Sequence, residues 1–299
     1  MPLNSPIPDP NHAEKSGRLY VVATPIGNRE DITCRALRIL REVDLIAAED
    51  TRKSGNLLAH YRIKNRLVSF HEHNEIKRTA ELIDKLLQGT TIALISNAGT
   101  PSVSDPGYRL VAAAIAQKIA VIPIPGVSAA TAAMSVSGLP TDSFAFIGFA
   151  PKKNGKRLKL LAELSVEPRP LIFYESPIRI SVLLGEIVSC MGDRKAVLAR
   201  EMTKLNEEFI RGSVSQILKI LKSRTEIKGE CTLLVDGFAG KKEPDSEMIA
   251  AEVKAALKKQ LGGLSQIAKL VAQKYGLPKN QVYDLALKVR KQMPKNKSR

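Results

Sequence analysis

The sequence predicts an α/β protein of two domains followed by a small helical unit. Three observations favour this fold class. The 299 residues suffice for two domains of about 100–200 residues each. Short apolar runs alternate with amphipathic helical segments in the first half, as in a mainly parallel sheet covered by helices. The end of the chain has only helical periodicity. We therefore expect a loose leader at 1–17, an N-terminal α/β domain at 18–147, a second α/β domain with a mixed sheet at 148–240 and a helical unit at 246–299.

Local patterns predict each element of the first domain. Arg18–Thr24 is β-branched and stops at the turn Pro25–Asn28, so a strand is expected there. Thr33 can cap the helix that follows. Glu75–Gln88 is an amphipathic helix. Its buried face is assigned to Ile76, Ala80, Ile83 and Leu87. The other expected elements are helices at 35–42, 51–60, 108–117 and 128–136, and strands at 44–47, 91–96 and 119–124, the last two buried.

The basic segment Gly148–Arg157 is expected to link the two domains. Beyond it, short turns between strands favour a mixed or antiparallel sheet. The predicted strands are 170–174, 195–200, 208–211 and 231–236, and the predicted helices are 157–164, 178–189 and 214–221. The tail has helices at 246–260, 265–275 and 280–291. The break Gly276–Pro278 gives the last two a helix-turn-helix-like pattern, although a plain helical hairpin fits as well.

Charge indicates a polyanionic partner. The chain has 46 Lys and Arg against 30 Asp and Glu, a net +16. Residues 241–299 alone carry 14 basic and five acidic residues, a net +9. A small, strongly basic unit attached to a less basic remainder of the chain predicts nucleic-acid binding. A solvated basic surface is the alternative.

Composition excludes several classes of protein. The three cysteines are far apart and form no CxxC pair, which argues against a zinc knuckle or a disulfide framework and fits a reducing cytoplasm. No apolar run reaches about 18 residues, so no membrane span is expected. The proline-containing start has no apolar stretch typical of a signal peptide.

Common catalytic motifs are absent from the sequence. It contains no GxGxxG, P-loop or HExxH pattern. The segment Pro125–Ala130 resembles a hydrolase nucleophile elbow, but no histidine follows its serine. His71 and His73 lack a third partner, so no metal site is predicted.

Three Pro/Gly turns instead follow predicted strands of the parallel sheet. They are Pro25–Asn28, the long loop Asn97–Gly107, and Pro125–Gly126. The carboxyl ends of such strands form the binding crevice of α/β sheets. Glycines allow close backbone approach and prolines stiffen the loops. The turns therefore favour a ligand held largely by backbone groups, although three ordinary tight turns would give the same pattern.

Eight motifs in one order give this sequence a family resemblance. They are Thr24-Pro-Ile-Gly-Asn28, Glu49-Asp-Thr-Arg52, His71-x-x-Asn-Glu75, Ala98-Gly-Thr-Pro101 with Ser104-Asp-Pro-Gly107, Pro125-Gly-x-Ser-Ala129, Ser137-Gly-Leu139, Tyr174-Glu-Ser-Pro177 and Arg200-Glu-x-Thr-Lys204. The chain resembles the tetrapyrrole methylase family over about 17–237, and within it the bacterial 16S ribosomal RNA cytidine 2′-O-methyltransferases, which have a similar helical tail. Two residues depart from the pattern: Asn97 replaces an expected Asp, and Ile178 an expected His.

The resemblance implies a tetrapyrrole-methylase-like fold and S-adenosylmethionine as methyl donor. It implies the ribose 2′-hydroxyl of a cytidine in the decoding region of 16S ribosomal RNA as acceptor, with the small ribosomal subunit as partner. It also implies a homodimer. The donor site is assigned to Pro25, Gly99, Thr100, Pro101, Val103, Ser128, Ala129, Tyr174, Glu175 and Thr232.

The other site residues are assigned by type and position. The catalytic candidates are Glu49, Asp50, Glu201 and Lys204, although each also suits a structural ion pair or helix cap. RNA phosphates are expected on Arg52, Lys152, Lys153, Lys156, Arg157, Lys269, Lys274 and Lys279. Two alternatives stay open: a methyltransferase acting on a corrin or sirohaem precursor, which would not need the basic tail, and a non-catalytic RNA-binding protein, which would not need the three turns.

Overall fold

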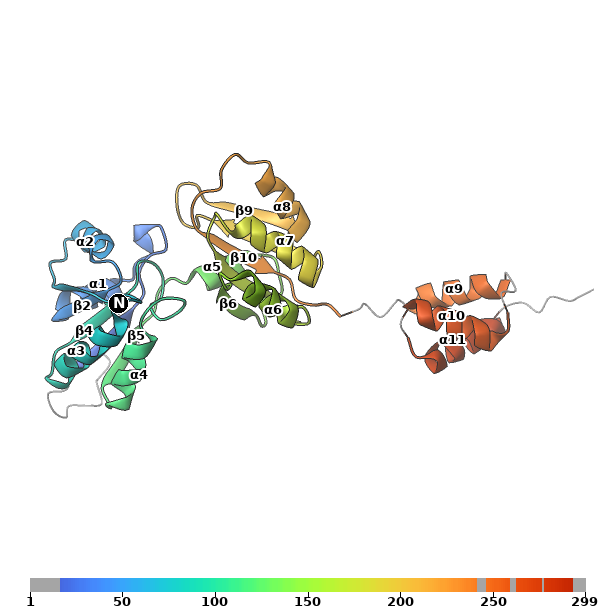
Figure 1. Cartoon of the computed structure of the whole chain (residues 1–299), viewed down its shortest axis with the longest axis horizontal. Helices are drawn as coiled ribbons and strands as arrows, with labels where there is room; N and C mark the ends of the chain where they lie inside the picture. The colour runs from blue at the N-terminus through green and yellow to red at the C-terminus, as the bar shows by residue number, and fades with distance from the viewer. Residues whose placement is uncertain (1–16, 241–245, 259–261, 276, 293–299) are drawn as a thin grey trace, which may run out of the picture. The chain divides into compact units, whose positions relative to one another are not determined.

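The computed structural model describes residues 17–240, 246–258, 262–275 and 277–292 (Figure 1). All of the predicted leader except Gly17 lies outside the described residues. The chain divides into two compact units, Met1–Gly237 and Phe238–Arg299. The first unit contains two five-stranded sheets, and the second is helical. Within the described part of the chain, no helix is long and apolar enough to cross a membrane.

The first sheet is entirely parallel, with the strand order β3-β2-β4-β1-β5. Its strands are β1 (Arg18–Val22), β2 (Leu45–Ala48), β3 (Leu67–Ser69), β4 (Ile92–Ile95) and β5 (Ala120–Ile124). Because β4 and β1 are central, the turns that follow them meet at one edge of the sheet.

Helices cover both faces of this sheet (Figure 1). The elements are the 3₁₀ helix η1 (Arg29–Asp31) and the helices α1 (Cys34–Glu42), α2 (Thr51–His60), α3 (Glu75–Leu87) and α4 (Tyr108–Ala116). Helices α1 and α2 share one apolar core with the sheet, and α3 and α4 share a second core. Thr33 caps α1 as predicted, since its hydroxyl accepts a hydrogen bond from the Ala36 amide at 3.1 Å.

The structure corrects two predictions in this sheet and adds one strand. Ile76 and Leu87 are 74% and 51% exposed, so α3 buries the neighbouring face that carries Leu82 and Leu86. Strand β5 lies at an edge and is mostly not buried. Its Pro123 fits an edge, because proline cannot donate to a ladder. The three-residue strand β3 was too short to be predicted.

The second sheet is mixed, as predicted, with the order β6-β7-β10-β8-β9. Only β6 and β7 are parallel neighbours. The strands are β6 (Ala145–Phe149), β7 (Leu171–Glu175), β8 (Lys195–Arg200), β9 (Glu208–Ser213) and β10 (Cys231–Val235). Helices α6 (Asn154–Leu164), α7 (Ile180–Met191) and α8 (Val214–Lys222) pack on one face. Helix α5 (Ala129–Ser135) packs on the other face. The expected boundary at 147 thus falls within β6, and α5 belongs with the second sheet.

The described residues of the second unit form three helices: α9 (Ser246–Lys258), α10 (Leu264–Tyr275) and α11 (Lys279–Gln292). They share an apolar core in which Val253, Ala268 and Ala286 are fully buried. Small residues at Ala268 and Ala272 allow the close helix packing expected from the sequence. This unit confirms the predicted helical tail, although residue 276 of the expected turn lies outside the described residues.

Candidate functional site

A first cavity of about 310 Å³ lies within the first unit, where loops from its two sheets meet. From the parallel sheet come the turn after β1, the loop after β4 and the segment after β5 that leads into α5. From the mixed sheet come the ends of β6 and β7 and the start of β10. Strands β7 and β10 are antiparallel, with Thr232 opposite Tyr174, so the end of one strand adjoins the start of the other.

Most of the predicted donor residues line the first cavity. Eight of the ten do so: Gly99, Thr100, Val103, Ser128, Ala129, Tyr174, Glu175 and Thr232. Pro101, in the loop after β4, is buried and does not line the cavity. Pro25 lines the adjoining second cavity instead. Residues from four predicted segments far apart in the chain are therefore brought together.

The loop after β4 is held in an unusual backbone conformation. Gly99 has φ +75°, and Ser102 and Ser104 also have positive φ, which costs about 1 kcal/mol or more for each serine. Reciprocal backbone hydrogen bonds of 2.9 Å join Gly99 to Thr24 at the end of β1. The carboxylate of Glu75 accepts hydrogen bonds from the Gly107 and Arg109 amides at 3.0 and 3.3 Å. These contacts fix the loop against the cavity.

Tyr174 organises the opposite wall. Its hydroxyl accepts a hydrogen bond of 3.1 Å from the Ala130 amide in the first turn of α5. Its ring packs edge-on against Phe146 and Phe149, with centroid distances of 5.0 and 5.7 Å. Burial raises the pKa of Tyr174, so the hydroxyl remains protonated at neutral pH. The side chain thus links β7 to the start of α5.

Acidic side chains give the first cavity its charge. Asp105, Glu175 and Glu230 line it, and no Lys or Arg of the described residues does. Glu175 is 3% exposed and pairs with Arg179 at 2.5 Å. Burial raises the pKa of Asp105 to about 6, and the nearby negative charge of Glu49 acts in the same direction. The cavity therefore suits a cationic ligand.

Sequence reasoning did not include several of these lining residues. Asp105 stood in a quoted motif, Ser104-Asp-Pro-Gly107, which was the available signal for it. Glu230 and Cys231 come from the start of β10, where no motif marks them. Cys231 is buried, and burial raises the pKa of its thiol to about 11.

None of the four catalytic candidates lines the first cavity. Asp50 caps α2, because its carboxylate accepts from the Arg52 and Lys53 amides at 2.9 and 3.4 Å. Glu49 accepts a hydrogen bond of 3.1 Å from the Asn97 amide. Asp50 thus has the helix-cap role considered for it, whereas Glu49 forms neither a helix cap nor a described ion pair and instead holds the backbone at the end of β4.

Lys204 and Glu201 form an ion pair beside the cavities. The Lys204 ammonium lies 2.8 Å from Glu201 and 2.7 Å from Glu230. The hydrogen bond from Lys204 lowers the pKa of Glu201. Burial opposes the charge of Lys204, but its hydrogen bonds to Glu201 and Glu230 together raise its pKa. Both groups are therefore ionised at neutral pH, and their catalytic role stays a prediction.

A second cavity of about 260 Å³ adjoins the first, and Ile26, Ala98 and Glu230 line both. Its wall includes Lys204 and Asn97, which stands where the family pattern has an Asp. The side-chain oxygen of Asn97 is buried without a hydrogen-bond partner among the described residues. Ile178, which stands where the family pattern has a His, is 88% exposed and follows Pro177 of the first cavity.

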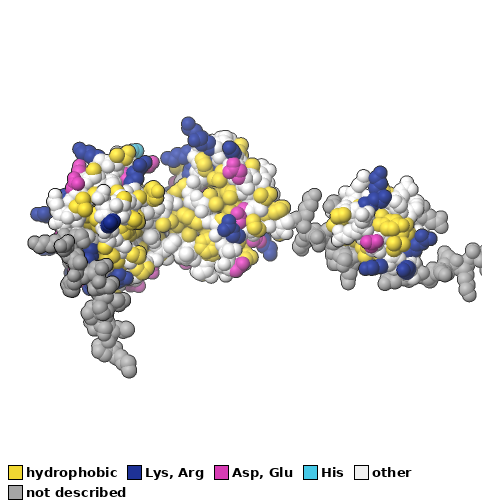
Figure 2. Space-filling view, turned by 90° about the horizontal axis from the view of Figure 1, so that it is seen from below, with side chains coloured by type: hydrophobic (Ala, Val, Ile, Leu, Met, Phe, Trp, Pro, Cys, Tyr) yellow, Lys and Arg dark blue, Asp and Glu magenta, His cyan; other side chains and the backbone are white. Residues whose placement is uncertain are grey.

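The side chains predicted to bind RNA differ in their exposure to solvent. Arg52, Lys152, Lys153 and Lys156 are exposed, and so are Lys269, Lys274 and Lys279 of the helical unit. In the helical unit, Lys274 pairs with Glu252. Figure 2 shows Lys and Arg side chains at several separate places on one face of both units.

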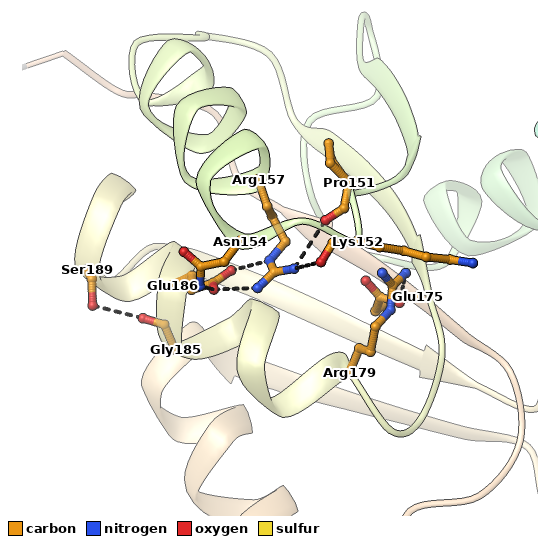
Figure 3. A network of polar contacts seen from close by, with 9 residues as sticks. All are labelled: Pro151, Lys152, Asn154, Arg157, Glu175, Arg179, Gly185, Glu186 and Ser189. Carbon is orange, nitrogen blue, oxygen red and sulfur yellow. Dashed lines mark hydrogen bonds and ion pairs between the residues drawn. The ribbon is translucent and has the colours of Figure 1, made fainter.

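Arg157 is a correction to this assignment. Its side chain is 9% exposed, and its guanidinium donates to Glu186 at 2.5 and 2.6 Å (Figure 3). It also donates to the Pro151 and Lys152 carbonyls at 3.1 Å each. Because these contacts occupy the guanidinium, Arg157 anchors the start of α6 and does not face solvent.

No group of three or more His, Cys, Asp or Glu side chains among the described residues could hold a metal ion. His71 and His73 are neighbours, with ring centroids 5.9 Å apart, and the expectation of no metal site stays a prediction.

Comparisons with known proteins cover both units. Residues 18–218 match the family described as tetrapyrrole (corrin/porphyrin) methylases, and 247–290 match the RsmI C-terminal HTH domain. A protein of Halalkalibacterium halodurans named ribosomal RNA small subunit methyltransferase I is 46% identical over 276 residues, which is 91% of this chain and 95% of that protein. Its namesake from Synechocystis sp. is 44% identical over 276 residues, 91% of this chain and 98% of that protein.

Solved structures share the fold at lower identity. The methyltransferase CobJ has a TM-score of 0.57 at 19% identity, covering 75% of this chain and 95% of its own. Uroporphyrin-III C-methyl transferase from Thermus thermophilus, complexed with S-adenyl homocysteine, has a TM-score of 0.52 at 17% identity, with 74% and 97% coverage. At these identities, the likenesses show that the chain shares the fold of these methyltransferases.

Proposed function

Because this chain belongs to the tetrapyrrole (corrin/porphyrin) methylase family, and within it to the small-subunit ribosomal RNA methyltransferases I, we propose that it transfers a methyl group from S-adenosylmethionine to the ribose 2′-hydroxyl of a cytidine in the decoding region of 16S ribosomal RNA. The first cavity holds the donor. The observation that carries this assignment is the convergence of eight predicted donor residues on one cavity.

The charge of the first cavity supports a sulfonium donor. S-adenosylmethionine carries a positive sulfonium and a positive ammonium against one carboxylate, so its net charge is positive. Three carboxylates line the cavity, with no lysine or arginine of the described residues among its lining. Glu175 and Glu230 are paired with Arg179 and Lys204, which lie outside this lining, so Asp105 supplies the unpaired negative charge. An anionic wall favours a cation and disfavours RNA phosphates. The tight loop at Gly99 supplies backbone groups close to the ligand.

Methyl transfer requires alignment above all. The 2′-oxygen attacks the methyl carbon in line with the sulfonium, a C–O bond forms, and the electrons of the broken C–S bond pass to sulfur. The donor becomes a neutral thioether, and the hydroxyl proton is lost to a base or to water. Holding both reactants in one geometry supplies much of the rate enhancement. A rigid, loop-fixed cavity provides for this.

RNA binding is assigned to the exposed basic residues and the helical unit. Residues 241–299 contribute +9 of the chain's +16. Lysines that bind phosphates supply affinity without reading sequence. The choice of a cytidine, of the decoding region and of the assembled small subunit rests on the family resemblance. A homodimer acting in the cytoplasm stays a prediction.

The two alternatives are weaker. The corrin and uroporphyrin methyltransferases share 16–23% identity with the chain, whereas the ribosomal RNA methyltransferases share 42–46%. The helical tail matches the RsmI C-terminal HTH domain. A non-catalytic RNA-binding protein would leave the acidic first cavity without a role.

Ribose-methylation mapping of ribosomal RNA tests the proposal. Cells lacking the gene should lose one 2′-O-methyl group in 16S RNA, and the purified protein with S-adenosylmethionine should restore it on their small subunits. An unchanged methylation map would refute the function. A rise in melting temperature with S-adenosylmethionine separates an enzyme from a simple RNA-binding protein.

Removing the helical unit tests its role. A shortened chain ending at Ala239 should keep its affinity for S-adenosylmethionine, because every residue lining the first cavity precedes Leu233. It should bind small subunits more weakly, with a shallower slope of log affinity against log salt, since fewer counterions are released. Full affinity with the same slope would show that the helical unit does not bind RNA.

A further inference from the structure

The second cavity has a charge opposite to that of the first. Arg29, Lys53 and Lys204 line it, and Glu230 is its one acidic residue among the described lining. Glu230 and Glu201 neutralise Lys204. Two cations therefore remain in its wall. An anionic group entering this cavity would find positive charge a short way from the acidic first cavity.

These two cations lack acidic partners. Arg29 contacts the ring nitrogen Nδ1 of His60 at 3.0 Å, and no ion pair joins it to any described carboxylate. The Lys53 ammonium has neither an ion pair nor a hydrogen bond within the described chain, and its side chain extends from the first turn of α2. Glu30 and Asp31 follow Arg29 in the chain, but neither lines the cavity. Unpaired cations on a concave wall are the groups that bind phosphate oxygens.

Asn97 adds an unused hydrogen-bond acceptor. Its backbone amide is bound by Glu49 at 3.1 Å, which fixes the residue at the end of β4. Its side-chain oxygen is buried, has no partner, and belongs to a residue lining the second cavity. A buried acceptor without a partner is unfavourable, and a ligand hydroxyl or amine that donates to it would remove that cost.

We propose that the second cavity holds the acceptor nucleotide, with Arg29 and Lys53 binding the phosphates on either side of its ribose and Asn97 accepting a hydrogen bond from the nucleotide. This inference rests on the proposed function, since it takes the first cavity as the donor site. The shared wall of Ile26, Ala98 and Glu230 places the two ligands next to each other. Opposite charges on the two cavities keep each ligand in its own site.

Loop contacts hold this arrangement together. The Asn28 amide donates to the Thr203 hydroxyl at 2.9 Å, which joins the turn after β1 to the loop after β8. A Cβ at Gly27 would lie 2.5–2.9 Å from atoms of Met202, Thr203 and Lys204, so only glycine permits this approach. The turn that carries Arg29 is thus fixed against the loop that carries Lys204.

The experiment compares Lys53→Gln and Arg29→Gln with Lys85→Gln, in the full-length protein. Lys85 is an exposed lysine on α3 that lines neither cavity. Binding and methylation are measured on small subunits that lack the methyl group, donor affinity by calorimetry, and folding by thermal melting. Lys53→Gln and Arg29→Gln should each weaken subunit binding about tenfold and reduce the salt slope by about one. Donor affinity and melting temperature should stay unchanged, and Lys85→Gln should match the parent in every measurement.

Asn97→Leu provides an independent measurement. It removes the acceptor while keeping the same number and branching of side-chain heavy atoms, so we expect lower kcat with unchanged donor affinity, because the nucleotide is less well positioned. The inference is overturned if the parent methylates subunits while Lys53→Gln and Arg29→Gln behave like Lys85→Gln. If the parent itself neither binds nor methylates subunits, the proposed function fails first.

Discussion

Replacing Arg157 by methionine is expected to destabilise the fold and to leave RNA binding intact. The guanidinium makes four hydrogen bonds, two of them to Glu186, whose side chain is 13% exposed. Methionine would leave this carboxylate buried without its counter-charge. Removing one partner of a buried ion pair costs about 3–5 kcal/mol. Asn154 still donates to Glu186 at 3.1 Å, so the lower end, about 3 kcal/mol, is expected.

This magnitude converts into a measurable melting temperature. Unfolding entropy is about 2.1 cal/mol/K per residue. Over residues 17–237 of the first unit, 1 kcal/mol therefore shifts the midpoint by about 2 °C. Differential scanning calorimetry of Arg157→Met should show the first unit melting about 6 °C lower. Binding to small subunits at a temperature well below the transition should match the parent.

Two matched variants sharpen the measurement. Lys156→Met changes an exposed neighbour on the same helix, so it should weaken RNA binding without lowering the midpoint. The double variant Arg157→Met with Glu186→Leu removes both charges and should recover part of the lost stability. The reasoning is refuted if Arg157→Met melts like the parent and binds subunits as weakly as Lys156→Met, because Arg157 would then be an RNA contact.

The remaining predictions concern the two cavities. Gly99→Val should weaken S-adenosylmethionine binding in calorimetry, because a β-branched residue at φ +75° strains the loop by about 2 kcal/mol; unchanged affinity in the folded variant would remove this loop from the donor site. The pKa of Asp105 is raised to about 6, so the carboxyl gains its negative charge as the pH rises through that value. Affinity for the cationic donor should therefore increase severalfold between about pH 5 and 7, and Asp105→Asn should abolish that increase. S-adenosylhomocysteine, which lacks the sulfonium charge, is the control ligand. If Glu201 or Lys204 takes part in catalysis, Glu201→Gln or Lys204→Met should lower kcat with donor affinity intact; full activity in both variants would leave them as a structural ion pair.

The first sheet could be predicted from the sequence largely because its elements are marked locally. Helix α2 begins and ends at the predicted residues, Thr51 and His60, where Asp50 supplies the cap. The prediction of the buried face of α3 was wrong, because Ile76 and Leu87 also fit a helical apolar stripe. Periodicity alone does not say which of two adjacent stripes packs on the sheet.

The residues of the candidate site could be predicted where Gly and Pro mark a loop in the sequence, and could not where only long-range strand pairing places them. Gly99 lies in a loop whose glycines and prolines are visible in the sequence. Glu230 and Cys231 reach the first cavity only because β10 pairs antiparallel with β7, a long-range pairing that no local pattern encodes. Arg157 looked like its basic neighbours, and only its distant partner Glu186 on α7 distinguishes it.

The thiol of Cys231 has a consequence for an enzyme that handles an alkylating agent. A sulfonium methyl group reacts with thiolates, and Cys231 lines the cavity assigned to the donor. With the pKa of its thiol raised to about 11, only roughly one molecule in 10⁴ carries the reactive thiolate at neutral pH. The burial that raises this pKa thus also protects the protein from methylating the sulfur of Cys231 between turnovers.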